Sequence, residues 1–157
     1  MEFFIKLLMF LYNKKMKGMK KMIIDGKEIE NKSEIVKLIK NGVNVLEFIK
    51  VDSDIDLIST SIVLEGKDDD LFYEESAEMI LKAAIYYVLN VDGEEKSLTR
   101  CKEILQQGIN NEDGVSILKN IFDKEYHAKD LYKFMDIALE RNQKLIMEKL
   151  KERLTKI

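Results

Sequence analysis

DDDLFYEESAEMILKAAIYYVLN, residues Asp68 to Asn90, is the stretch that decides the fold of this chain. Apolar and small residues recur in it at three- and four-residue steps, which is the pattern of a helix with one buried face. Asp69 or Asp70 can accept hydrogen bonds from the first free N–H groups of this helix and complement the positive end of its dipole. Ala83 and Ala84 are small, so a neighbouring helix can approach closely there. We expect the other helices to pack around this one.

Apolar periodicity on both sides of this stretch predicts further helices. The expected helices begin at Asp52 or Ser53, at Ser97, near Val115 and at Tyr126. The last of them reads as one helix over residues 126–157 or as two, with a break near Arg141 and Asn142. The sequence has no proline, the commonest helix breaker. We therefore predict a mainly α fold, a multi-helix bundle, with residues 52–157 as an all-α domain.

Residues 22–51 carry a different pattern, which predicts a small strand-helix-strand (βαβ) unit. Met22 to Ile24 is a short β-prone run, a helix capped by Ser33 ends at Asn41-Gly42, and residues 43–49 are again β-rich. Strand, helix and strand at this spacing favour a pair of parallel strands. The alternative is a hairpin around Asp25-Gly26, with residues 22–24 against 28–30. Its arms would be very short, so we expect the βαβ unit.

Residues 1–21 combine an apolar run with a cluster of lysines. The run from Phe3 to Tyr12 is interrupted by Lys6 and is too short to span a bilayer. It lacks a basic leader and a cleavage site of the A-x-A kind, so a secretory signal is not expected. Two interpretations stay open: a helix that packs on the core, or an interfacial helix whose lysines lie near anionic lipid.

Length and composition limit the class of protein. The 157 residues suit one domain, or one domain with a small appendage. The 26 basic and 29 acidic side chains nearly balance, which does not predict a general nucleic-acid binder, although local basic patches remain compatible with the sequence. Cys101 is the only cysteine, so no disulfide can form within the chain and a reducing compartment is the simpler expectation.

Residues that carry chemistry are sparse. The sequence has no GxxxxGK[ST] phosphate loop, no CxxC, no HExxH and no DxDxDG loop. Cys101 and His127 are the only pair that could act as nucleophile and base, but Cys101 lies on the apolar stripe of its helix. The acidic run at residues 68–70 is explained by helix capping better than by a cation site. We expect no enzyme activity, no cofactor and no metal.

Three stretches carry a resemblance to a known family. Residues 22–49 look like a strand ending in Asp-Pro-Lys-Gly-Glu, then a helix and a second strand, with Asp25, Lys27 and Glu28 in the places of the motif's Asp, Lys and Glu. Residues 48–90 are similar to the entry into an all-α domain, where DLFYE at 70–74 matches Asp-Pro-Phe-Trp-Glu. EEKSLTRCKEILQQG and EYHAKDLYKFMDIA look like the next two helices. Together these stretches resemble the cytoplasmic part of the TraG-like type IV secretion coupling proteins, the conjugative DNA-transfer ATPases.

The departures from this family limit what the resemblance implies. The family's phosphate-binding loop lies upstream of the Asp-Pro-Lys-Gly-Glu strand, and residues 1–21 hold nothing similar. The resemblance therefore implies a truncated form, without ATP binding or hydrolysis, of the all-α domain that engages relaxosome and secretion-substrate proteins. An alternative is an inactive remnant of a decayed coupling-protein gene. The expected location is cytoplasmic, or peripheral at the inner face of the bacterial membrane, because the parent family is membrane-associated.

A contact surface is expected on the last helix and at the acidic entrance to the central one. Its basic members would contact a protein partner or the phosphates of single-stranded DNA. The candidate contact residues are Lys129, Lys133, Arg141, Lys144, Lys149, Lys151, Arg153, Asp68, Asp69 and Asp70.

Overall fold

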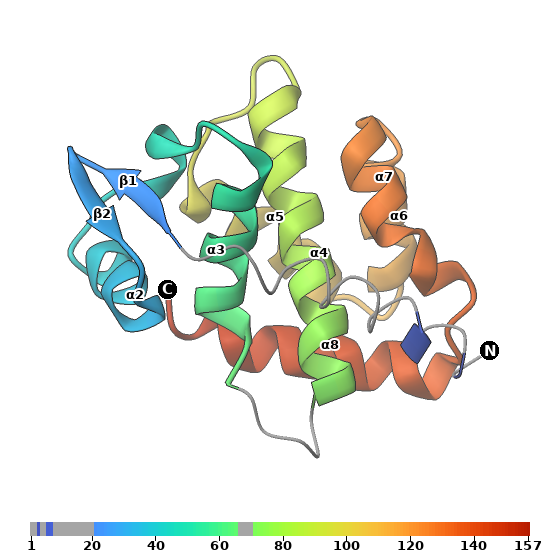
Figure 1. Ribbon diagram of the computed structural model, residues 1–157. Coiled ribbons are helices and arrows are strands. Elements are labelled where there is room, and N and C mark those ends of the chain that lie inside the picture. The colour runs from blue at the N-terminus through green and yellow to red at the C-terminus, as the bar shows by residue number, and fades with distance from the viewer. Residues whose placement is uncertain (1–2, 4–5, 8–20, 66–70) are drawn as a thin grey trace.

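The computed structural model describes residues 3, 6–7, 21–65 and 71–157. In chain order its elements are β1 (Met22–Ile24), β2 (Lys27–Ile29), α2 (Lys32–Lys40), η1 (Val45–Phe48), α3 (Asp52–Val63), α4 (Leu71–Asn90), α5 (Leu98–Ile109), α6 (Gly114–Phe122), α7 (Tyr126–Tyr132), η3 (Lys133–Asp136) and α8 (Glu140–Leu154). The predicted mainly α bundle is confirmed (Figure 1). None of the described helices is long and apolar enough to cross a membrane.

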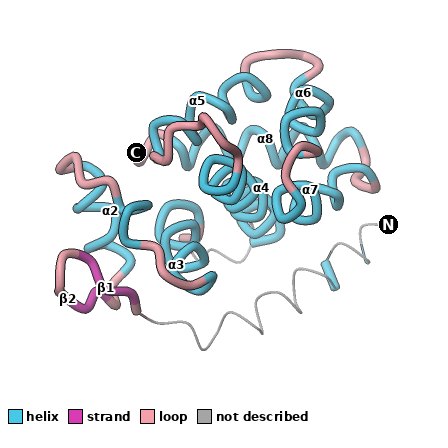
Figure 2. Tube along the Cα trace, turned by 90° about the horizontal axis from the view of Figure 1, so that it is seen from above, coloured by secondary structure: helices cyan, strands magenta, loops and turns pink. Residues whose placement is uncertain are grey.

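Helix α4 is the centre of the bundle, as the sequence predicts. Figure 2 looks nearly along its axis and shows α3, α5, α7 and α8 arranged around it. Ala83 and Ala84 are fully buried, consistent with close neighbouring helices. The prediction of a single buried face on this helix is wrong, because α4 is buried on almost every side and is exposed to solvent only near its ends. Leu71, the first apolar residue of the stretch, is 38% exposed at the first turn.

The N-terminal part corrects the predicted βαβ unit. Strands β1 and β2 pair antiparallel, with Met22 opposite Ile29 and Ile24 opposite Lys27. Asp25 and Gly26 have φ angles of 54° and 79°, and positive φ at both central positions defines the two-residue type I′ turn that suits a hairpin. The short arms persist because the side chains of Met22, Ile24 and Ile29 are buried against the rest of the domain.

The expected second strand, residues 43–49, is not a strand. It forms the 3-10 helix η1, whose first turn is capped by Asn44: its side chain accepts a hydrogen bond from the Leu46 N–H at 3.3 Å. Val45 and Leu46 belong to the apolar run that suggested a β-strand, and they are buried in this 3-10 helix instead. Element η1 packs against β1 without extending the sheet.

Most of the helix ends that the sequence predicts are found in the structure at or near the predicted residues. Ser97 caps α5 as predicted, accepting a hydrogen bond from the Arg100 N–H at 3.1 Å. The cap of α2 is Asn31 and not the predicted Ser33, since Asn31 Oδ1 accepts from the Ser33 N–H at 2.8 Å. Helix α2 ends at Asn41-Gly42 as expected, where Gly42 adopts a φ of 86°.

The C-terminal stretch is divided, but earlier than predicted. Helices α7 and η3 end before Ile137, and α8 begins at Glu140. The Gln143 side chain donates a hydrogen bond to the Met135 carbonyl at 2.7 Å and holds this corner. Because of the corner, α8 crosses beneath α3 and α4 (Figure 1).

Two expectations fall outside the described residues. The proposed N-terminal helix at 1–21 falls mostly on positions 1–2, 4–5 and 8–20. The caps Asp69 and Asp70, together with the contact candidate Asp68, lie in the 66–70 segment.

Candidate functional site

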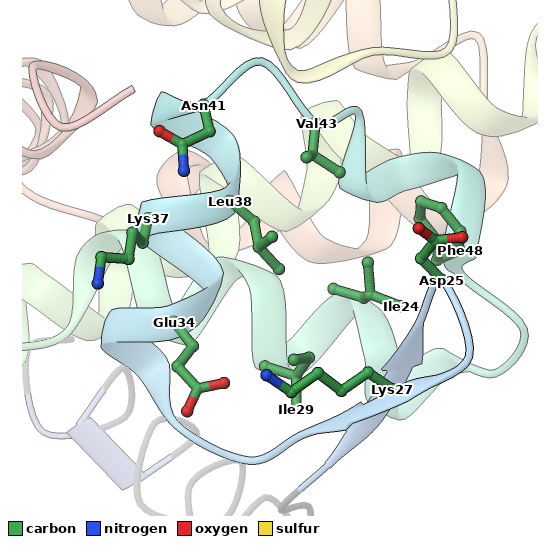
Figure 3. A pocket seen from close by; sticks show the side chains of 10 residues that line it. All are labelled: Ile24, Asp25, Lys27, Ile29, Glu34, Lys37, Leu38, Asn41, Val43 and Phe48. Atoms are coloured by element: carbon green, nitrogen blue, oxygen red, sulfur yellow. The ribbon is translucent and has the colours of Figure 1, made fainter.

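A hollow lies between the hairpin and α2. Its volume is about 530 Å³, within the range of small-molecule and side-chain binding sites. Figure 3 shows Leu38 of α2 and Ile24 of the hairpin towards the middle of the hollow, with charged side chains from both elements around them. The lining residues are Ile24, Asp25, Lys27, Ile29, Glu34, Lys37, Leu38, Asn41, Val43 and Phe48.

Local sequence patterns build both walls of this hollow. On α2, Glu34, Leu38 and Asn41 follow each other at four and three residues, so they share one helix face. The alternation of the strands turns Ile24 and Ile29 to the same side of the hairpin, where both are buried. The hollow therefore has an apolar floor held by core residues.

The mouth of the hollow carries charges of both signs. The hairpin contributes Asp25 and Lys27, and α2 contributes Glu34 and Lys37. Two carboxylates and two ammonium groups sum to no net charge. This arrangement suits an apolar group flanked by charges of both signs, and it supplies no activated nucleophile or base.

A second groove, of about 210 Å³, lies where the start of α3, the end of α4 and the start of α7 meet. The ring of His127 stacks on Tyr86 with centroids 4.9 Å apart, and Tyr126 meets His127 edge-on at 5.5 Å. Burial raises the pKa of Tyr86, and the nearby Asp52 carboxylate adds to this rise. Tyr126 is 77% exposed, so one aromatic face of this group is open to a ligand.

Glu125 caps α7 beside this groove. Its carboxylate accepts hydrogen bonds from the N–H groups of His127 at 2.9 Å and Ala128 at 3.0 Å. Burial raises the pKa of Glu125, but these hydrogen bonds outweigh burial and the net pKa is lowered. The His127 Nδ1 atom lies 3.3 Å from the same carboxylate, so the ring of the only histidine in the chain contacts the residue that caps α7.

Cys101 and His127, the pair of nucleophile and base that the sequence offers, receive no support from the structure as a catalytic pair. Cys101 is fully buried in the core, and burial raises the pKa of its thiol. A thiol without solvent access and with a raised pKa is a poor nucleophile. Among the residues described, no group of three or more His, Cys, Asp or Glu side chains could hold a metal ion.

Helix α4 carries a buried row of ionisable side chains that sequence reasoning missed. Glu74, Glu78 and Lys82 follow each other at four-residue steps, and all three are buried. Lys82 forms an ion pair with Asp56 of α3, and Glu74 lies 2.7 Å from the Arg153 guanidinium of α8. The four-residue spacing is visible in the sequence, but it also describes an exposed face, so it gave no signal of burial.

Glu78 is the least compensated member of this row. Its Oε1 atom accepts hydrogen bonds from Thr60 at 2.6 Å and Ser59 at 3.3 Å, while its Oε2 atom has no hydrogen-bond partner among the described residues. Burial raises its pKa from 4.5 to about 7, although Thr60 and Lys82 oppose the rise. Burial and the charges of Glu78 and Glu74 likewise raise the pKa of Glu75 to about 7.

The structure corrects one predicted contact residue in particular. Arg153 was expected on an exposed face, but it is 3% exposed and binds Glu74 and the Val63 carbonyl, the latter at 2.9 Å. It lies in the last turns of α8, where the helix meets the end of α3 and the start of α4. Arg153 therefore joins three helices and cannot serve as a surface contact.

The other basic candidates remain at the surface to different degrees. The Lys149 side chain is only 12% exposed and lies 3.2 Å from Glu152, and Lys133 lies 2.8 Å from Asp130. The exposed members are Lys129, Lys133, Arg141, Lys144 and Lys151. They are spread over α7, η3 and α8 and do not gather in one site. Residues 68–70 lie outside the described part of the chain.

No family model, curated protein or solved structure matches this chain.

Proposed function

We propose that this chain is a non-enzymatic helical interaction domain related to the all-α domain of TraG-like coupling proteins. In this role it engages a relaxosome or secretion-substrate protein. Support comes from where the described residues of the resembling stretches lie: residues 71–74 of DLFYE form the first turn of the central helix α4, and the next resembling stretches form α5 and α7, which pack on it. The same resemblance supports a cytoplasmic location, at the inner face of the bacterial membrane in the parent family.

The distribution of charge on α8 favours a protein over a nucleic acid as the partner. Along its exposed side Arg141, Lys144 and Lys151 are interspersed with Glu148 and Glu152. A surface that tracks a phosphate backbone needs a run of cations, since each neutralised phosphate contributes to affinity. Interspersed charges of both signs instead favour specific pairing with a protein surface.

Direct binding to relaxosome and secretion-substrate proteins encoded on the same genetic element tests this proposal. We expect saturable binding that changes little between 50 and 200 mM salt, roughly the range over which phosphate contacts weaken steeply. The double variant Lys144→Glu/Lys151→Glu should weaken binding, whereas Lys124→Glu, an exposed lysine in the turn between α6 and α7, should not. If none of these proteins binds the folded chain, the proposal is wrong.

One observation favours single-stranded DNA as a second candidate. Exposed Tyr126 shares a face of α7 and η3 with Lys129 and Lys133, at steps of three and four residues. A tyrosine ring can stack on a base while lysines contact phosphates. Titration with a single-stranded oligonucleotide at two salt concentrations should then show steep salt dependence and loss of binding in Tyr126→Ala. Absence of binding at both concentrations would exclude this candidate.

A further inference from the structure

We propose that the hollow between the hairpin and α2 binds an amphipathic helical segment of a partner protein. Apolar side chains of that segment enter the hollow, and its charged flanks pair with the charges at the mouth. The inference rests on the proposed function in that the partner is a protein, and it adds the place and chemistry of the contact.

The size of the hollow sets the kind of occupant. An apolar cavity of about 150 Å³ accepts a molecule as large as benzene. The hollow, at about 530 Å³, therefore has room for about three groups of that size. Three apolar side chains at i, i+3 or i+4, and i+7 are what an amphipathic helix presents to a groove.

The floor of the hollow is formed in advance. Ile24 and Ile29 are each 3% exposed, and the buried Ile35 fixes the adjacent turn of α2. Leu38 and Val43 are only partly buried, so they offer apolar surface that a ligand could cover. A preformed apolar site binds without much ordering of its own side chains, which preserves affinity.

The charges at the mouth select among occupants. Asp25, Lys27, Glu34 and Lys37 sum to zero, so the hollow does not attract a polyanion such as DNA. An acyl chain would fill the floor but would leave both signs of charge unpaired. A helix with acidic and basic residues beside its apolar stripe satisfies both, and such pairs fix its orientation more than they add affinity.

A displayed peptide library provides the test. Its members are amphipathic helices with Leu, Ile, Met or Phe at three anchor positions and Asp, Glu, Lys or Arg at the flanks, selected against the full chain. A scrambled library of the same composition removes the periodicity. We expect enriched binders from the periodic library alone, with methyl NMR shifts concentrated on Ile24, Ile29, Leu38 and Val43.

Variants in the hollow then decide whether the selected peptides bind there. Leu38→Gln places an amide on the floor and should weaken binding about tenfold, as expected for loss of an anchor contact. Lys37→Glu leaves the floor intact and should weaken it about threefold, as expected for one exposed charge. Lys124→Glu, an exposed lysine in the turn between α6 and α7, is the matched control and should leave affinity unchanged. Thermal unfolding confirms that each variant is folded.

The outcomes separate this inference from the proposed function. Absence of enrichment, equal enrichment from the scrambled library, or affinity unaffected by both Leu38→Gln and Lys37→Glu would overturn the hollow as a helix-binding site. If relaxosome or substrate proteins bind equally well to Leu38→Gln, the proposed function stands and this inference fails. If helical peptides bind in the hollow but those proteins do not bind the chain, this inference stands and the proposed function fails.

Discussion

Replacing Glu78 with glutamine should stabilise the protein at neutral and alkaline pH and leave its stability nearly unchanged in acid. Glu78 is fully buried between α4 and α3, and its Oε2 atom has no hydrogen-bond partner among the described residues. Glutamine has nearly the shape of the protonated acid. Its side-chain oxygen can still accept the hydrogen bond that Thr60 now donates at 2.6 Å. The substitution therefore removes the charge and keeps the packing.

The pKa of Glu78 gives the size of this effect. Folding raises it from 4.5 to about 7, a difference of about 2.5. At about 1.36 kcal/mol for each pH unit, ionisation in the folded state costs on the order of 3 kcal/mol. The folded carboxyl holds its proton more tightly than the unfolded one. The free energy of unfolding therefore falls as pH rises from about 4.5 to 7 and is constant above that.

Urea denaturation of the wild type and Glu78→Gln at pH 4, 5.5, 7 and 8 measures the difference directly. We expect the variant to be more stable at pH 8 by up to about 3 kcal/mol, with the advantage vanishing near pH 4. Some pH dependence should survive, because Glu75 also has a raised pKa of about 7, to which the charge of Glu78 contributes. The exposed Glu148→Gln variant serves as control, with an expected change within about 0.5 kcal/mol at every pH. A Glu78→Gln protein less stable than the wild type at pH 8 would refute this reasoning, since it would mean that Thr60 and Lys82 favour the ionised carboxylate more than burial opposes it.

Three further changes probe the packing of the bundle. Arg153→Ala leaves the buried Glu74 carboxylate without its guanidinium, so chemical denaturation should show a loss of about 3 to 5 kcal/mol, whereas a loss under 1 kcal/mol would contradict the joining role of Arg153. In Gly114→Ala the new Cβ would overlap the carbonyl oxygen of Gly108, so α5 and α6 must separate; we expect at least about 2 kcal/mol of destabilisation, and an unchanged melting temperature would be incompatible with that contact. The Cys101 thiol should react with a thiol reagent only on unfolding, so rapid labelling of native protein would show that the core is open there.

The N-terminal correction shows how local signals compete. Asp25-Gly26 is a strong turn signal, and it is present in the sequence together with the apolar residues on either side. A hairpin with three-residue strands is too short to be stable alone, and for this reason the sequence analysis preferred a βαβ unit with parallel strands. Burial of Met22, Ile24 and Ile29 against the domain supplies the missing stability, and that burial depends on residues distant in the chain.

The candidate sites were predictable to different degrees. The expected contact surface on α8 remains exposed at Arg141, Lys144 and Lys151, because a helix period alone separates polar from apolar faces. Arg153 belongs to the same helix, but the position of α3 and α4 above it encloses its side chain. The hollow beside α2 was not foreseen, since it exists only once the hairpin folds over that helix.

The sequence by itself determined the helices, most of their ends and the central place of α4, because periodicity, capping residues and the absence of proline act through neighbours a few residues apart. Only the tertiary structure decided that the strands pair antiparallel, that Glu78 is enclosed and that Arg153 reaches Glu74. Each of these depends on contacts between segments far apart in the chain, where packing sets burial and charge compensation. The turn signal at Asp25-Gly26 is local, but the burial that stabilises the short hairpin is not.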